Sequence, residues 1–159
     1  MAFFRKPVQP VLRPLRSERA EQCAALHAAC FAHSWSAPEF ETLLSNAAVS
    51  GEAAVDPKTD DLRGFILTRL AADEAEILTI AVDGAFRRRG VGRSLLSSHM
   101  SRLPSAGARA LFLEVERDNA AAIALYARFG FREVGQRPGY YRKRDGSAAA
   151  ALILRRDLI

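Results

Sequence analysis

A change of hydrophobic period at Gly90 constrains this chain more than any other feature. Before it, residues 77–82 are a largely apolar run of strand length. After it, positions of one helix face recur at helical spacing: Val91, Leu95, Leu96, His99 and Leu103. We therefore expect a strand that passes through a glycine-containing loop into a helix, which is a building unit of sheets covered by helices.

The remaining periodicities predict a single α/β (α+β) domain over residues 1–159, with residues 1–10 as a flexible N-terminal extension. Besides 77–82, we expect strands at 11–15, 48–55, 62–70, 110–115, 131–135 and 148–154. Ser17 is expected to cap a first helix, and Ser36 to open a second through a capping box with Glu39. Asp118 or Asn119 should cap the last helix, and Gly130 should end it. The predicted sheet is mixed.

Composition narrows the protein class without choosing a function. The chain of 159 residues is 49% hydrophobic and 26% charged, and no apolar stretch approaches the ~20 residues of a membrane span. We expect a cytoplasmic protein with no membrane partner. The net charge of +5 suits a nucleic acid, an anionic small molecule or a ribosome-associated partner.

One helix face carries Cys23, His27 and Cys30, which makes a metal site conceivable. Nothing nearby supplies the further ligands that a closed zinc site requires. We therefore expect cysteines packed as small hydrophobes and no bound metal.

The segment from Arg87 to Arg93 has the properties of an anion site. Gly90 and Gly92 let the backbone approach a ligand, and the first N–H groups of the following helix have no partner within it. The helix dipole and the arginines add positive charge. The loop lacks the lysine and hydroxyl of a P-loop and is not G-x-G-x-x-G, so a pyrophosphate site of another kind is indicated. A solvated basic turn or a nucleic-acid patch are the alternatives.

Residues 87–92 fit the Q/R-x-x-G-x-G/A pattern, and here the sequence resembles the GNAT acetyltransferase superfamily. It resembles most the bacterial ribosomal-protein-alanine N-acetyltransferases, the RimI type. Four segments carry the resemblance: 31–36, 80–93, 113–126 and 130–141. The resemblance implies a GNAT-type domain with a mostly antiparallel sheet flanked by helices. It also implies acetyl-CoA as donor and, as acceptor, the N-terminal alanine of a small-subunit ribosomal protein.

Two side chains are candidates for moving protons. Glu114 lies in a strand whose Leu113 and Val115 face the other way, and a carboxylate acting through water could deprotonate an α-amino group of pKa ~8. Glu116, on the same face, is its competitor. Tyr126 could protonate a departing thiolate, although its spacing also suits a core aromatic. The resemblance implies the base role for Glu114 and the acid role for Tyr126.

The resemblance also implies which residues hold the donor. Backbone groups of Ile80, Ala81 and Val82 would contact the pantetheine and, through one N–H, the thioester oxygen. Asn119 would contact the donor's arm as well as cap its helix. The pyrophosphate would be held by the loop and helix residues Arg88, Arg89, Gly90, Val91, Gly92 and Arg93.

The acceptor is less well defined than the donor. Arg142 stands where the resembled family usually has a proline, and residues 147–150 replace its acidic pair. Trp35, Tyr140 and Tyr141 are candidates for the acceptor groove, and Trp35 is equally a candidate core anchor. Acetylation of another protein N-terminus, a lysine or a small amine stays open, as does a non-catalytic acyl-CoA-binding or RNA-binding module. The sequence leaves the oligomeric state open.

Overall fold

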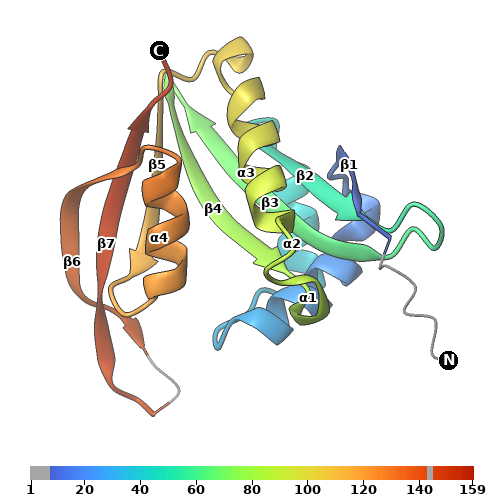
Figure 1. Ribbon diagram of the computed structural model, residues 1–159, viewed down its shortest axis with the longest axis horizontal. Coiled ribbons are helices and arrows are strands. Elements are labelled where there is room, and N and C mark those ends of the chain that lie inside the picture. Colours follow the sequence, from blue (N-terminus) through green and yellow to red (C-terminus); the bar gives the residue numbers. More distant parts are fainter. Residues whose placement is uncertain (1–7, 143–144) are drawn as a thin grey trace, which may run out of the picture.

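A seven-stranded sheet organises residues 8–142 and 145–159, which the computed structural model of the chain describes. The side chains of residues 140–142 and the first seven residues of the expected N-terminal extension lie outside this description. The strands are β1 (Val11–Pro14), β2 (Val49–Val55), β3 (Leu62–Ala71), β4 (Glu74–Val82), β5 (Ala110–Glu116), β6 (Arg132–Arg142) and β7 (Ala148–Asp157). The helices are α1 (Ala20–Cys30), α2 (Ala37–Leu44), α3 (Val91–Arg102) and α4 (Ala120–Arg128) (Figure 1).

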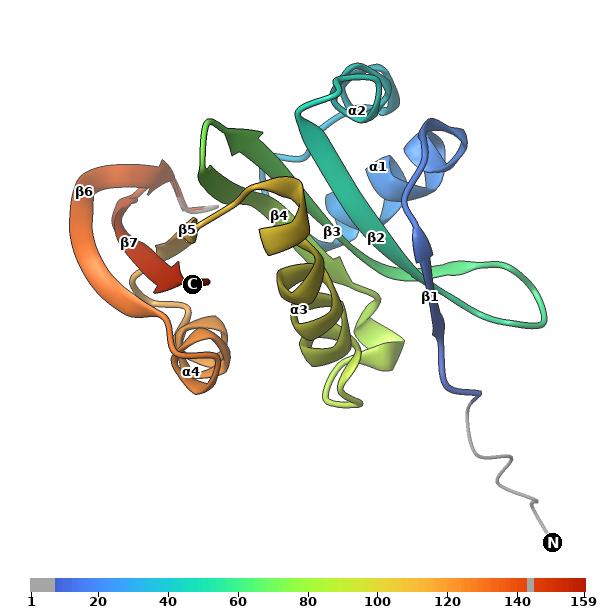
Figure 2. The same ribbon diagram turned by 90° about the horizontal axis from the view of Figure 1, so that it is seen from above.

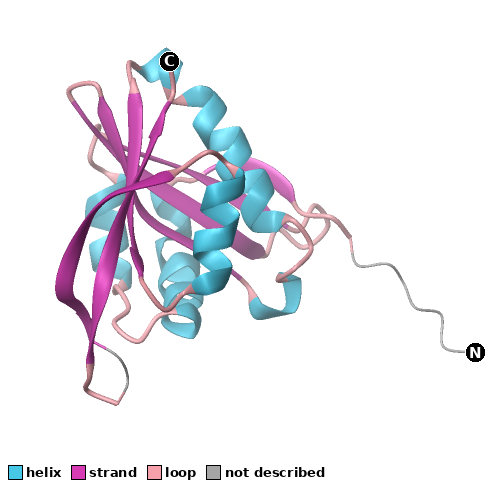
Figure 3. Ribbon diagram, turned by 60° about the vertical axis from the view of Figure 1, so that its left-hand side comes forward, coloured by secondary structure: helices cyan, strands magenta, loops and turns pink. Residues whose placement is uncertain are grey.

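Helices cover both faces of the sheet and divide the core in two. α1 and α2 lie on one face, and α3 and α4 lie on the other (Figure 2). Each face buries its own apolar cluster, one around Phe40 and Phe65 and the other around Ile66, Leu96 and Leu111. The sheet between these two layers of helices is twisted, as Figure 3 shows.

The strand order is β1-β2-β3-β4-β5-β7-β6, and only β4 and β5 pair in parallel. All the other described pairs are antiparallel, so the expected mixed, mostly antiparallel sheet is confirmed. The parallel pair covers only three positions, of which Glu76 with Phe112 is the last. Beyond this pair the strands separate, so the sheet is split in its middle (Figure 1).

A β-bulge in β4 lies beside the split. Leu67 pairs with Thr79 and Thr68 pairs with Ile77, which leaves Leu78 as an extra residue. A bulge of this kind puts two consecutive side chains on one face and bends its strand. Accordingly Leu78 packs in the cluster on the α1 side, and Leu67, the partner of Thr79, lies in the same cluster. The bulge therefore turns the second half of β4 away from β5.

The structure corrects several expected boundaries. Ser17 does not cap α1: residues 17–19 form a 3-10 turn, and α1 begins at Ala20 without a side-chain cap. The Ser36–Glu39 capping box is confirmed, and so is Asn119 as the cap of α4. β6 extends to Arg142, seven residues beyond its expected end, because it pairs with β7 along that length.

Two further findings concern membrane-spanning helices and metal sites. None of the helices in the described ranges is long and apolar enough to cross a membrane. Within the same ranges, no group of His, Cys, Asp and Glu side chains could hold a metal ion. Cys23 is instead fully buried in the core, and burial raises the pKa of its thiol to about 12.

Candidate active site

A cleft of about 1060 Å³ opens where the sheet is split. Its walls are the end of β4, the loop before α3, the first turn of α3 and one side of α4. Nearly all the predicted donor-binding residues line it: Ile80, Ala81, Val82, Arg88, Gly90, Val91, Gly92, Arg93, Asn119 and Tyr126. The cleft thus joins two segments whose nearest lining residues, Arg93 and Asn119, are 26 positions apart in the sequence.

The first turn of α3 presents backbone donors to this cleft. Gly90 is its N-cap with φ of 79°, a left-handed conformation that glycine adopts without strain, and no side chain caps the turn. Arg88 is left-handed too, with φ of 61°. Left-handed turns of this kind direct successive N–H groups into an anion-binding concavity, to which the helix dipole adds positive charge.

A buried polar network fixes α3 to the sheet. The Thr68 hydroxyl on β3 lies 2.7 Å from Nε2 of His99, and the Ser98 hydroxyl donates to Oε2 of Glu52 at 2.8 Å. Arg102 approaches the other Glu52 oxygen at 3.2 Å. Burial lowers the pKa of His99, and the neighbouring Glu52 opposes that shift. The second half of α3 therefore holds this helix against the sheet, while its first turn faces the cleft.

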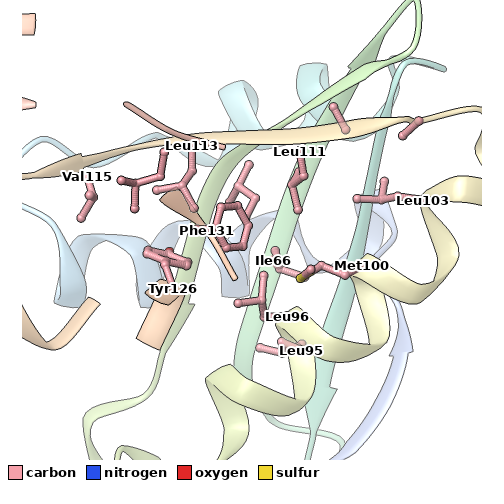
Figure 4. Close-up of a cluster of buried hydrophobic side chains, with 14 of the residues drawn as sticks. Ile66, Leu95, Leu96, Met100, Leu103, Leu111, Leu113, Val115, Tyr126 and Phe131 are labelled. Carbon is pink, nitrogen blue, oxygen red and sulfur yellow. The ribbon is translucent and has the colours of Figure 1, made fainter. Parts of the chain in front are cut away.

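α4 contributes a polar cap and a buried phenol to the cleft. The Asn119 side chain accepts a hydrogen bond of 3.1 Å from the N–H of Ala122. Tyr126 is only 5% exposed, and its ring packs against Phe131 with a centroid separation of 5.5 Å. Figure 4 shows both rings beside Leu113, beneath β5. Tyr126 is therefore a core aromatic that also lines the cleft, and its role as an acid stays a prediction.

The end of α1 closes another side of the cleft. Cys30 and Phe31 line it, although the sequence patterns do not reveal them. The Cys30 thiol lies 3.5 Å from the Val82 carbonyl, to which it donates, and Arg87 lies 3.5 Å from the same sulfur. Arg87, from the predicted anion segment, and Arg128, which no sequence pattern indicated, also line the cleft. Arg89 does not line the cleft and instead stacks over Phe86, 5.5 Å from the ring centroid.

Glu114 is not among the residues that line the cleft. Its neighbours Leu113 and Val115 are buried on the α3–α4 side, which directs Glu114 toward the α1–α2 side. The Glu114 carboxylate is 16% exposed and forms an ion pair of 3.2 Å with Arg137 on β6. Glu116 lies two residues further along β5 and therefore on the same face as Glu114. Both carboxylates lie beyond the last described pair of β4 and β5, which joins Glu76 to Phe112.

An aromatic cluster anchors the connection between α1 and α2. His27 is buried, and its ring stacks on Trp35 at 4.7 Å and lies 4.5 Å from Phe31. The backbone N–H of Trp35 donates to Nδ1 of His27 at 3.1 Å. Burial lowers the pKa of His27 to about 4, and Glu39 opposes the shift. Trp35 is thus anchored in the core, while the side chains of Tyr140 and Tyr141 lie outside the described residues.

The sequence and the fold of this chain are similar to those of several known proteins. An uncharacterized protein of Mycobacterium leprae is 40% identical over 154 residues. The ribosomal protein bS18-alanine N-acetyltransferase of Salmonella typhimurium is 43% identical over 94 residues, which are 59% of this chain. The crystal structure of the ribosomal-protein-S18-alanine N-acetyltransferase from Escherichia coli superposes with a TM-score of 0.86 at 30% identity, covering 93% of each chain.

The lengths of the aligned regions limit what these relatives imply. The chain spans 40% of the Mycobacterium leprae protein and 64% of the Salmonella enzyme. The profile of the Acetyltransferase (GNAT) family matches residues 20–131, which include α1, the split and the whole of α4. By this match and by the superposed fold, the chain belongs to the GNAT acetyltransferase family.

Proposed function

We propose that this protein transfers an acetyl group from acetyl-CoA to the α-amino group of an N-terminal alanine on a small-subunit ribosomal protein. The observation that carries this proposal is the cleft at the split sheet. It combines an uncapped helix N-terminus, free backbone at the end of β4 and a buried phenol. These are the groups that a pyrophosphate, a pantetheine chain and a departing thiolate require.

The donor fits the cleft by charge and by shape. Arg88 and Arg93 flank the N–H groups of the first turn of α3, where the pyrophosphate would bind. Among the described residues, β4 has no strand partner on its β5 side beyond Glu76. The backbone of residues 80–82 is therefore available to the pantetheine, except for the Val82 carbonyl, which accepts a hydrogen bond from the Cys30 thiol. Asn119 would hold the same arm from α4. Acetyl-CoA supplies the activated thioester, and the residues of this chain supply its orientation.

Proton movement is assigned to residues on the two sides of the split. Glu114 would accept the proton of the acceptor amine through water, since an ammonium has no lone pair with which to attack. A backbone N–H of β4 would stabilise the developing oxyanion. Tyr126 would protonate the thiolate, because a phenol of pKa ~10 lies close to a thiol of pKa ~8.5. Arg137 would hold the Glu114 carboxylate in place.

The acceptor rests on the relatives. The Salmonella and Escherichia coli proteins are named for acetylation of the alanine of a ribosomal protein, bS18 or S18. The region that follows Tyr141 departs from their type at Arg142 and at residues 147–150. The test therefore includes other acceptors.

A peptide panel read by coenzyme A release tests the proposal. The panel holds ribosomal peptides that begin with alanine, the same peptides with other first residues, a lysine peptide and free amines. We expect the alanine-initiated ribosomal peptide to react fastest. A faster reaction with lysine or a free amine would refute the acceptor and retain the acetyltransferase, and no thermal shift with acetyl-CoA would refute the donor as well.

A matched pair of variants tests the base. Glu114→Gln should lower turnover about 100-fold while the thermal shift with acetyl-CoA stays unchanged. Glu116→Gln, on the same face of the same strand, is the control and should retain turnover. Normal turnover in Glu114→Gln together with loss in Glu116→Gln would transfer the role to Glu116.

A further inference from the structure

Thr79 holds a buried hydroxyl that no described residue satisfies. The residue is 7% exposed, and its Oγ1 has no hydrogen-bond partner among residues 8–142 and 145–159. Thr68 belongs to the next pair of the β3–β4 register, and its buried hydroxyl has a partner, since it contacts His99. Buried hydroxyls are nearly always paired, because leaving one unpaired destabilises the folded state. The exception therefore calls for a functional explanation.

The bulge in β4 decides where this hydroxyl lies. Because Leu78 is the extra residue, Thr79 shares the face of Leu78 and of its partner Leu67. That is also the face of Glu114. Without the bulge, strict alternation would place Leu78 and Thr79 on opposite faces of the sheet.

The register of the parallel pair sets the height of Thr79 along the split. Glu76 pairs with Phe112, and two residues further along each strand are Leu78 and Glu114. Thr79 follows directly, so it stands across the split from Glu114, where the strands have separated. The two side chains therefore lie on the same face of the sheet, on the two sides of the split.

We propose that the Thr79 hydroxyl binds the acceptor's amino group and, with Glu114, aims its lone pair through the split at the thioester. This inference rests on the proposed acetyl transfer and adds a residue to its acceptor side. A hydroxyl oxygen accepts a hydrogen bond from one amine N–H, which leaves another proton for removal and the lone pair free to attack.

The step balances without any change of protonation at Thr79. The C–N bond forms as the C–S bond breaks, the amine proton passes through water to Glu114, and the thiolate receives the proton of Tyr126. Thr79 neither gains nor loses a proton. Its contribution is orientation, so its loss should reduce reaction with the acceptor and leave donor binding intact.

Thr79→Val and Thr79→Ser test this assignment. Valine replaces the hydroxyl by a methyl group of similar size, and we expect kcat/KM for the acceptor peptide to fall about tenfold or more. The KM for acetyl-CoA and the apparent pKa of the pH–rate profile should stay unchanged. Serine keeps the hydroxyl and should retain most of the activity.

The melting temperature separates this role from a structural one. Removing an unsatisfied buried hydroxyl should leave the Tm of Thr79→Val unchanged or raise it by a few degrees. Thr68→Val, which removes a hydroxyl with a partner, should lower the Tm. Full acceptor kcat/KM in Thr79→Val, a fall in its Tm, or a Thr79→Ser variant as slow as valine would each overturn the assignment.

The wild-type protein separates failure of this inference from failure of the proposed function. An active wild type with an unaffected Thr79→Val refutes the role of Thr79 alone. A wild type that binds no acetyl-CoA and releases no coenzyme A with any amine of the panel refutes both.

Discussion

His27 should make the stability of this protein depend on pH between pH 7 and pH 4. Burial lowers its pKa to about 4 from an ordinary value of 6.5, so in this range the unfolded chain binds the proton and the folded chain does not. The stability is therefore fully present above the unfolded pKa and is lost as the pH falls toward 4. Protonation would also remove the Nδ1 acceptor of the Trp35 N–H.

The size of the effect follows from the two pKa values. The full shift corresponds to about 3.4 kcal/mol, and titration from pH 8 to pH 5 already removes about 2 kcal/mol. For a domain of 159 residues this amounts to a fall of roughly 4 to 8 °C in Tm.

Urea unfolding at pH 8 and pH 5 measures this contribution. Trp35 is the only tryptophan of the chain and stacks on His27, so its fluorescence reports the transition. His27→Gln keeps an acceptor for the Trp35 N–H and cannot gain a proton. We expect its loss of unfolding free energy between the two pH values to be smaller than that of the wild type by about 2 kcal/mol.

Two features of the design isolate His27. Other groups with a shifted pKa, such as His99, contribute equally to wild type and variant, so the difference between the two slopes belongs to His27. His33→Gln removes an exposed histidine near the same connection and should keep the wild-type slope. Equal slopes for wild type and His27→Gln would refute the reasoning.

Three further variants test other parts of the structure. Asn119→Ala removes the cap of α4 and should lower the unfolding free energy by about 1 kcal/mol and raise the KM for acetyl-CoA, whereas an unchanged urea midpoint would show that the cap contributes nothing. Thr68→Val should cost about 1 to 3 kcal/mol by calorimetry, because it removes the contact of the Thr68 hydroxyl with Nε2 of His99, and an unchanged Tm would contradict this. Gly51→Ala would place a Cβ 2.6 Å from a backbone oxygen and should lower the Tm more than Gly84→Ala, whose Cβ meets nothing within 4 Å; equal melting temperatures would rule out the clash.

Local patterns predicted the elements whose causes are local. The period change at Gly90, the Ser36–Glu39 capping box and the cap at Asn119 are all written within a few residues, and the structure confirms each. Ser17 fits the same rule on paper, but the chain makes a 3-10 turn there before α1 begins.

Features that depend on pairing between distant segments escaped the sequence. The sequence predicted that β6 ends at Gly135, and Pro138 and Gly139, which are residue types common in turns, follow that position. Pairing with β7 carries the strand past them, and the register shifts between Arg137 and Tyr141 to accommodate a proline that has no N–H. The register also brings Arg137 to Glu114 across β7, which no local motif announces.

The sequence predicted those residues of the candidate site that belong to a local motif. It did not predict the residues that only the packing of distant segments brings to the site. The loop of residues 87–93 follows a recognisable pattern, and most of it lines the cleft. Arg89 points elsewhere because the Phe86 ring offers its guanidinium a stacking surface. Phe31 and Arg128 reach the cleft only through the packing of α1 and α4, and the position of Thr79 depends on a bulge that the apolar run of β4 conceals.

The split between β4 and β5 has a kinetic consequence. In the proposed function the pyrophosphate of acetyl-CoA binds at the first turn of α3 on one face of the sheet, whereas Glu114 points to the other face and lies outside the cleft. The two substrates would then reach the reacting centre by separate entrances. Acetyl-CoA and the acceptor could then be bound at the same time, and the acetyl group would pass directly between them without a covalent acetyl-enzyme intermediate. Initial-rate plots at varied acetyl-CoA should therefore intersect for different acceptor concentrations, and parallel lines would mean that the sheet does not keep the two paths apart.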